Sequence, residues 1–379
     1  MKSETPQSYD SLTTTTIHTN PFYKVDIVVI GAGQAGLSAA YYLKKFGIKP
    51  GTGFVVLDDE EGPGGAWRNR WDSLTLKTVN GLSDLPGMPF SDAVDTNDLA
   101  IQVNTGVPKY FGEYESKFEL PIIRPLKVQE VYKRNDRFFI KTNGVQFSAK
   151  GIINATGTWK NPNWPKYPGI EKFKGLQLHT KDYKRPEDFY NKHVIIVGAG
   201  ISAVQMLGEL SKVTNTTWVT RRPPVFSKEE FTEELGREAV AKVEERVREG
   251  LPPQSVVSVT GLSITPTVAD LIQKGILERK PMFDEITENG VRWKDGTELK
   301  ADVIFWNTGF THSLDHLKPL HLKNDQNGIT MTGKLATQVA NDPSIHLTGY
   351  GPSASTIGAN RAGRVVAREL IQYLELDKK

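Results

Sequence analysis

Short apolar runs that end in glycine are the clearest feature in the pattern of hydrophobic and polar positions. Residues 25–30 (VDIVVI) form one such run, and residues 35–46 follow with apolar positions at helical spacing. A second run, FVVL, occupies residues 54–57. Continuous apolar runs of this length are typical of strands that are buried on both faces of a parallel sheet. The pattern therefore predicts a β-α-β unit near the N-terminus.

The same order of elements recurs in the middle of the chain. His193–Val197 is predicted to be a strand, Ser202–Leu210 a helix and Thr217–Thr220 another strand. A strand, a helix and a second strand in this order are the repeating unit of a dinucleotide-binding fold. The predicted fold class is therefore α/β, with two Rossmann-like dinucleotide-binding domains.

Two further predicted strands have similar endings and bracket the second unit. Residues 151–157 (GIINATG) and 302–309 (DVIFWNTG) both end in Thr-Gly. We interpret them as the two crossings between domains. The predicted architecture is therefore nested, with a domain of residues 160–306 inserted into a first domain that is made of residues 21–159 and 307–379.

Two segments fall outside this scheme. Residues 1–20 lack hydrophobic periodicity and are predicted to be a flexible arm without an assigned function. Residues 227–273 contain a charged helical stretch followed by a segment rich in proline and valine. We interpret this second segment as an elaboration of the inserted domain, and the alternative is a solvated amphipathic helix.

Composition narrows the classes of function. The 379 residues, 38% of them hydrophobic, are enough for two cores. The 47 basic residues are interleaved with 44 acidic ones, so no footprint for nucleic acid is present and a small-molecule substrate is favoured. The chain contains no cysteine, which excludes disulfides, thiolate metal sites and a redox dithiol, and no metal is expected. No apolar run has the length of a signal peptide or membrane span, which predicts a cytoplasmic protein, and a homodimer is left open.

The first apolar strand leads into a glycine-rich turn, Gly-Ala-Gly-Gln-Ala-Gly, before the predicted helix. Gly31 permits the tight turn, Gly33 lets the backbone approach a diphosphate, and Gly36 lets helix and strand pack closely. The diphosphate would then lie at the positive N-terminus of the helix. An ordinary glycine loop is the alternative. The residues predicted to bind a dinucleotide here are Gly31, Gly33, Gln34, Ala35 and Gly36.

A second turn of the same type follows the strand at residues 193–197. It reads Gly-Ala-Gly-Ile-Ser-Ala, with alanine in place of the third glycine. The substitution is tolerated because only the closeness of helix and strand depends on it. Gly198, Gly200, Ile201 and Ser202 are the predicted binding residues.

The charge at the end of the following strand distinguishes the two turns. Asp58 ends the first unit and can accept hydrogen bonds from free ribose hydroxyls, as in FAD or NAD. Thr220, Arg221 and Arg222 occupy the corresponding place in the second unit, where hydroxyl and cationic donors suit a 2′-phosphate. FAD is therefore predicted at the first turn and NADPH at the second. A solvated strand end is the alternative for the arginine pair.

A short segment after Asp58 adds two candidates. Gly65, in Gly-Gly-Ala-Trp, offers a backbone amide beside the flavin diphosphate, and Trp67 offers an indole that can cover apolar cofactor surface. A core tryptophan after an incidental turn is the alternative.

From about Val25 onwards the chain resembles the flavin-containing monooxygenase family. The sharpest match is Phe173-x-Gly175-x-x-x-His179-x-x-x-Tyr183, which reproduces the identifying motif of that family. Related Baeyer–Villiger monooxygenases carry Trp-Pro or Trp-Asp at the end of the motif, so the resemblance favours oxygenation of nitrogen or sulfur over oxygenation of a ketone.

The resemblance also implies roles for single residues. The motif is interpreted as a hinge in which Gly175 frees the backbone, while its aromatic residues and His179 pin the segment where the domains meet. A surface connector is the alternative for His179. Asn80 stands where the family places an asparagine near the flavin, and its amide is the candidate catalytic donor. A plain Asn-Gly turn is the alternative for Asn80.

The chemistry that the resemblance implies is oxygenation. NADPH would reduce FAD, O₂ as co-substrate would form a flavin C4a-hydroperoxide, and an amine or thioether would take the distal oxygen. Three rival functions are weighed against it. Disulfide reductases with the same architecture need a cysteine pair and are excluded. An NADPH oxidase or ferredoxin-reductase-like flavoprotein, and a non-catalytic sensor of these cofactors, stay open.

Overall fold

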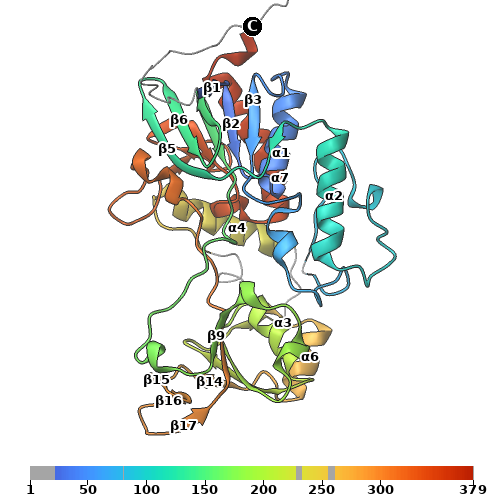
Figure 1. Ribbon diagram of the computed structural model, residues 1–379, viewed down its shortest axis with the longest axis vertical. Helices are drawn as coiled ribbons and strands as arrows, with labels where there is room; N and C mark the ends of the chain where they lie inside the picture. Colours follow the sequence, from blue (N-terminus) through green and yellow to red (C-terminus); the bar gives the residue numbers. More distant parts are fainter. Residues whose placement is uncertain (1–21, 80, 228–232, 255–260, 379) are drawn as a thin grey trace, which may run out of the picture.

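The elements of the chain form two lobes that are joined by extended segments (Figure 1). The computed structural model describes residues 22–79, 81–227, 233–254 and 261–378. The larger lobe holds both ends of the described chain, and the smaller lobe holds its middle. The predicted arm of residues 1–20 lies outside the described residues.

The N-terminal β-α-β unit forms the centre of a seven-stranded sheet in the larger lobe. Strand β2 (Ile27–Ile30), helix α1 (Gln34–Lys45) and strand β3 (Phe54–Leu57) follow the predicted pattern closely. Strand β2 pairs in parallel with β3 on one side and with β8 (Gly151–Asn154) on the other. The sheet order is β19-β20-β21-β8-β2-β3-β4, where the outer strands are β4 (Ile122–Ile123), β19 (Met331–Thr332), β20 (Gln338–Val339) and β21 (Asp342–Leu347).

Both faces of this sheet are covered, which is why its central strands are apolar at every position. Ile27 and Val29 pack under helix α1, whereas Val28 and Ile30 belong to a core on the opposite face. Helix α7 (Thr356–Tyr373) packs along α1, and α2 (Val103–Lys117) extends the helical layer. The opposite core is covered by a four-stranded sheet of β1 (Phe22–Lys24), β5 (Val128–Arg134), β6 (Arg137–Thr142) and β7 (Gln146–Ala149).

The smaller lobe contains the second predicted unit. A five-stranded parallel sheet has strands β10 (His193–Val197) and β11 (Asn215–Thr220) near its centre. Helix α3 (Ile201–Leu210) connects these two strands. Two dinucleotide-binding-type domains of mixed α/β structure are thereby confirmed. The other elements of this lobe are β9 (Leu176–His179), β14 (Arg279–Pro281), β18 (Val303–Trp306), helix α6 (Pro266–Gln273), the pair β12 (Phe226–Ser227) and β13 (Leu262–Ser263), and the antiparallel strands β15 (Glu285–Thr287), β16 (Gly290–Arg292) and β17 (Glu298–Lys300).

The two strands with Thr-Gly endings, β8 and β18, lead into segments that join the lobes. The chain leaves the large sheet after β8, and it returns after β18. The crossings bond to each other, since Thr311 N–H donates to the carbonyl of Asn161 at 2.9 Å and Ser313 N–H donates to that of Gly157 at 3.0 Å. The second domain is therefore inserted into the first.

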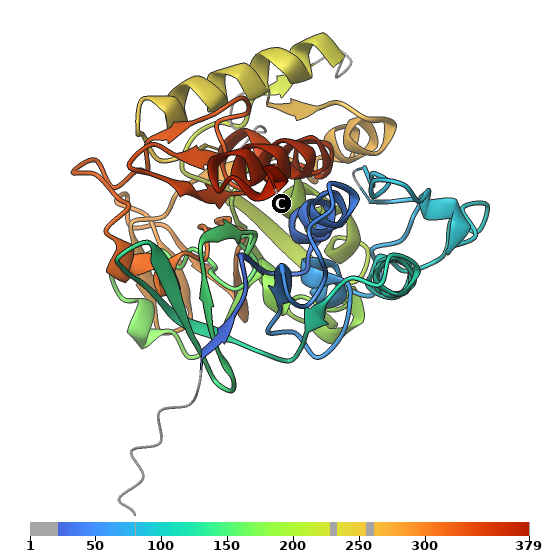
Figure 2. The same ribbon diagram turned by 90° about the horizontal axis from the view of Figure 1, so that it is seen from above.

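Helix α4 (Glu233–Arg248) corrects one interpretation. Its residues Ala239, Val243 and Val247 are buried at a four-residue spacing, and Val247 belongs to a core of the larger lobe. The helix packs against η7 (Gly351–Ala354) and β19, and Figure 2 shows it in yellow beside the C-terminal elements in red. The interpretation of residues 227–273 as an elaboration of the inserted domain is thus wrong for this helix, because its apolar stripe completes the first domain.

Within the described ranges, no helix combines the length and the apolar character that crossing a bilayer requires.

Candidate cofactor and active site

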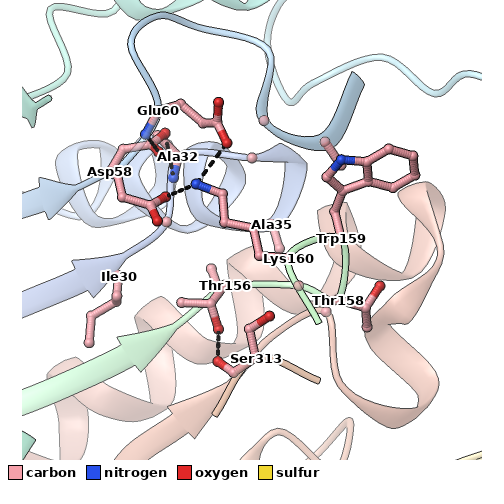
Figure 3. Close-up of a pocket in the computed structure, with 18 of the residues that line it drawn as sticks. Ile30, Ala32, Ala35, Asp58, Glu60, Thr156, Thr158, Trp159, Lys160 and Ser313 are labelled. Carbon is pink, nitrogen blue, oxygen red and sulfur yellow. Dashed lines mark hydrogen bonds and ion pairs between the residues drawn. The ribbon is translucent and has the colours of Figure 1, made fainter. Parts of the chain in front are cut away.

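A cavity of about 740 Å³ opens beside the first glycine-rich turn. It lies at the carboxyl ends of β2, β3 and β8, the edge at which open α/β sheets bind ligands. Figure 3 shows side chains from these strand ends pointing into it. The predicted FAD-binding residues that line the cavity are Gly31, Gly33, Gln34, Ala35, Asp58, Gly65 and Trp67.

The turn itself has the geometry that a diphosphate needs. Gly31 has φ +101°, and a Cβ there would lie 2.6 Å from the carbonyl oxygen of Ala155. At Gly36, a Cβ would lie 1.8 Å from the carbonyl oxygen of Gly31, so Gly36 serves close packing of helix on strand. Open space surrounds the Cβ position of Gly33. The N-terminus of α1 is therefore accessible to an anion, and the residues present fit a dinucleotide diphosphate.

Asp58 is buried and already has protein partners. Its Oδ2 accepts from the Ala32 N–H at 3.2 Å and pairs with the Arg124 guanidinium at 3.1 Å, and its Oδ1 accepts from the Glu60 N–H at 3.0 Å. A carboxylate has about four lone-pair sites, so acceptor capacity is left. Binding of a ribose hydroxyl by Asp58 stays a prediction.

Several residues of this cavity were not predicted. Lys160, within the first crossing, pairs with Asp59 at 2.7 Å and with Glu60 at 2.8 Å, and Figure 3 shows it reaching toward Glu60. Thr156 donates to the carbonyl of Ser313 at 2.7 Å and so ties the two crossings together at the cavity. Thr156 and Lys160 both follow an apolar strand in the sequence, and this position could have identified them as candidate site residues. The others include Arg70, Trp159, His316 and four residues around the start of helix α7, Ser353, Ala354, Ser355 and Thr356.

The second turn repeats the geometry of the first. Gly198 has φ +139°, and a Cβ there would lie 2.2 Å from the carbonyl oxygen of Asn307, as Gly31 meets Ala155 in the other domain. Gly200 has open space at its Cβ position. The Trp218 indole N–H donates to the Gly198 carbonyl at 2.6 Å and fixes the turn on strand β11. Ile201 and Ser202 begin helix α3, so this N-terminus too can approach an anion.

The predicted 2′-phosphate residues lie next to this turn. Strand β11 pairs with β10 and ends at Thr220, which is buried, while Arg221 and Arg222 are exposed. Thr220 donates its hydroxyl to the carbonyl of Arg222 at 2.8 Å. The structure adds Arg279 from the neighbouring strand β14, whose Nη1 donates to the carbonyl and hydroxyl oxygens of Thr220 at 3.1 and 3.2 Å. Arg279 was missed because the pairing of β14 with β11 is a tertiary feature.

The hinge interpretation is corrected at Gly175. A Cβ at this residue would lie 2.4 Å from the carbonyl oxygen of Asp302 and 2.5 Å from the Phe173 ring, and its φ lies outside the left-handed region. Gly175 is therefore required by close packing and not by backbone freedom. Phe173 belongs to the core of the inserted domain together with Ile304 and Trp306, so neither residue reaches the crossings.

His179, by contrast, contacts the second crossing. Its Nε2 lies 3.0 Å from the carbonyl oxygen of Gly309, and its ring meets Phe310 edge-on at 4.8 Å. The side chain is buried, which rules out the alternative of a surface connector. Burial lowers the pKa of His179 below its ordinary value, so the ring is neutral near pH 7.

Tyr183 connects the two lobes. Its hydroxyl donates to Oε2 of Glu209 on helix α3 at 2.8 Å, and the same oxygen accepts from the Ser73 hydroxyl of the first domain at 2.6 Å. The Tyr183 ring packs edge-on against Trp71 of the first domain at 5.9 Å. Burial and the Glu209 carboxylate raise the pKa of Tyr183. We call Ser73, Tyr183 and Glu209 the interdomain triad.

Two further expectations concern this region. Asn80, the candidate catalytic donor, lies outside the described residues, so its proposed role stays a prediction. Among the residues that the structure describes, no group of three or more His, Asp or Glu side chains is arranged to hold a metal ion.

Comparison with known proteins agrees with this geometry. Residues 28–349 match the family model described as pyridine nucleotide-disulphide oxidoreductase. A solved flavin-containing monooxygenase from Stenotrophomonas maltophilia is 35% identical, with a TM-score of 0.77, over 92% of this chain and 99% of that one. The chain belongs to the flavin-containing monooxygenase family.

Two curated relatives are also similar to this chain. The uncharacterized oxidoreductase CzcO of Bacillus velezensis is 31% identical over 301 residues, which cover 77% of this chain and 83% of that protein. Dimethylaniline monooxygenase [N-oxide-forming] 2 of Mus musculus is 25% identical over 365 residues, which cover 80% of this chain and 65% of that protein. This member of the flavin-containing monooxygenase family is therefore an enzyme, a flavin-dependent oxidoreductase.

Proposed function

We propose that the protein is an FAD-dependent, NADPH-consuming monooxygenase that transfers one atom of O₂ to a soft nucleophile, an amine or a thioether. One observation carries the proposal: a dinucleotide cavity with Asp58 at its strand end and a second turn flanked by arginines occur in a chain without cysteine. Electrons from a nicotinamide at the second turn have no dithiol to pass to. The resemblance to monooxygenases favours O₂ as the acceptor of these electrons.

The residues at each turn would bind and orient the cofactors. The N–H groups at the start of α1 would hold the FAD diphosphate, and those at Ile201 and Ser202 would hold that of NADPH. Arg221 and Arg222 supply charge for a 2′-phosphate, while Arg279 holds the Thr220 corner beside them. Bound flavin supplies the acceptor for hydride and the means to activate dioxygen.

The remaining task of the protein is to limit water. The aromatic residues Trp67, Trp159 and Phe310 line the cavity, and Trp159 stacks on Phe310 at 5.0 Å. Aromatic walls of this kind exclude water and so limit the unproductive release of hydrogen peroxide. A neutral His179 beside Phe310 adds no charge to this wall. No side chain needs to act as a nucleophile in this scheme.

Rapid mixing of the reduced, flavin-loaded protein with O₂ tests the proposal. We expect a flavin absorbance that differs from that of oxidised flavin, that persists while NADP⁺ is bound, and that decays faster when thioanisole is added, with one sulfoxide formed per NADPH. Immediate reoxidation with stoichiometric hydrogen peroxide and no sulfoxide would show an NADPH oxidase instead. Oxygenation of cyclohexanone, with no reaction of the thioether or an amine, would show a Baeyer–Villiger enzyme.

A further inference from the structure

Arg70 lies in the wall of the candidate flavin cavity, beside two indole rings. Its guanidinium carbon is 4.4 Å from the centre of the Trp159 ring and 5.4 Å from that of Trp67. Asn104 Nδ2 donates to the Arg70 carbonyl at 3.2 Å and so holds the backbone. Arginine is suited to this place because its planar, weakly hydrated cation stacks on aromatic faces.

The charge of Arg70 has no protein counter-ion in the described part of the chain. No carboxylate there lies within 4 Å of its guanidinium, and its buried Nε has no hydrogen-bond partner. Two other cations near the cavity are paired: Arg124 contacts Asp58 at 3.1 Å, and Lys160 contacts Asp59 at 2.7 Å. Burial lowers the pKa of Arg70 to about 10, which still leaves it charged near pH 7.

An uncompensated, half-buried cation is costly to maintain, so a position of this kind requires a compensating role. The planar guanidinium has an N–H edge that can take a partner, and its buried Nε has no acceptor among the described residues. That edge suits carboxylate and phosphate oxygens, which accept two parallel hydrogen bonds from arginine. Trp159 comes from the first domain crossing and stacks on Phe310 from the second, so Arg70 lies at the end of the cavity where the domains meet.

We propose that Arg70 is an oxyanion-binding residue of the cavity, and that its guanidinium pairs with a carboxylate or phosphate carried by a bound ligand. The oxyanion has two sources: a carboxylate on the substrate, or a diphosphate of one of the two cofactors. The substrate class would in the first case be a carboxylate-bearing thioether or amine. This inference rests on the proposed function only in taking the cavity to be the flavin site and the substrate to be a soft nucleophile.

Three measurements on Arg70→Gln distinguish the sources. The first compares KM for 4-(methylthio)benzoate with KM for uncharged thioanisole in the flavin-loaded enzyme. The second compares the Kd of the apoprotein for FAD with its Kd for riboflavin, which lacks phosphate. The third is the Kd of the flavin-loaded enzyme for NADP⁺, read from the flavin spectrum without turnover. Arg68→Gln is the matched control, because Arg68 is two residues away and contacts Glu60 at 3.9 Å and the Pro63 carbonyl at 3.1 Å.

Arg70→Gln should raise one of these constants by about ten- to a hundredfold, the effect of one charge-assisted hydrogen bond, while Arg68→Gln changes each less than about threefold. Selective loss of the carboxylate substrate assigns the oxyanion to the substrate, and selective loss of FAD or NADP⁺ assigns it to that cofactor. All constants within twofold of wild type would overturn the proposal.

Arg70→Lys keeps the test decisive if the glutamine variant does not fold. Lysine retains the charge but loses the planar fork, so the same constant should rise by a smaller factor, about three- to tenfold. No change in any constant for a folded lysine variant also contradicts the proposal. A wild-type enzyme that oxygenates neither these thioethers nor an amine refutes the proposed function, while the FAD and NADP⁺ measurements still decide the role of Arg70.

Discussion

At the scale of single residues, the charge at the strand ends is what distinguishes the proposed FAD site from the proposed NADPH site. Asp58 directly follows strand β3 and Thr220 ends strand β11, the corresponding strand of the second unit, yet Asp58 is followed by acidic residues and Thr220 by two arginines. The glycines of both turns are explained by carbonyl oxygens that a Cβ would meet. The difference between the two sites therefore lies in side chains and not in the backbone.

Replacing Arg221 by alanine tests the proposed 2′-phosphate site. The variant should raise KM for NADPH by about tenfold or more, because a charge-assisted hydrogen bond contributes about 1.5–3 kcal/mol, and it should change KM for NADH by less than twofold. Steady-state kinetics with both nucleotides measure this difference. Arg292→Ala is the control, since Arg292 is an exposed arginine of the same domain that pairs with Glu285 and Glu298. Equal increases for both nucleotides would refute the assignment.

At the scale of elements, the interdomain triad links helix α3 to the first domain. A single oxygen of Glu209 accepts from Ser73 and from Tyr183, so loss of the carboxylate removes two contacts at once. Gln205, one turn earlier on the same helix, donates to the carbonyl of Thr78 at 3.1 Å. Helix α3 thus serves both the second turn and the domain interface.

A double-mutant cycle with Tyr183→Phe and Glu209→Gln measures this link. Each single change should lower the free energy of unfolding by about 1–2 kcal/mol, and the coupling between them should reach about 1 kcal/mol because the groups share a half-buried hydrogen bond. Urea denaturation of the four proteins gives these values. Tyr190→Phe, at an exposed tyrosine, is the control. Additivity within about 0.3 kcal/mol would show that the two residues act independently.

At the scale of the whole molecule, the three histidines with the most strongly lowered pKa values make stability depend on pH. Burial lowers the pKa of His346 to about 3 and those of His312 and His316 to about 4, from an ordinary value of 6.5. The folded state therefore binds fewer protons than the unfolded state between these values. Their contribution to stability is present above pH 6.5 and is lost as the pH falls toward 4.

The free energy of unfolding should accordingly fall between pH 7 and pH 4.5, with each of these histidines adding up to about 1.4 kcal/mol per pH unit to the slope. His346→Leu should remove one such contribution, since the ring packs within the first domain and, among the described residues, its one hydrogen-bonding contact is with Thr337 Oγ1 at 3.4 Å. His321→Gln, at an exposed histidine, should leave the slope unchanged. Urea unfolding at a series of pH values gives the slopes. A slope in His346→Leu equal to that of wild type would contradict this account.

The sequence by itself determined both dinucleotide units and the first glycine-rich turn, because apolar periodicity and the steric demands at Gly31 and Gly36 are local properties. It also determined the absence of dithiol chemistry. Only the tertiary structure decided which residues meet across elements. It brought Arg279 to the end of β11, placed α4 on the first domain, and set Arg70 beside two indoles from separate segments. Such contacts join residues that are distant along the chain, and no local pattern encodes them.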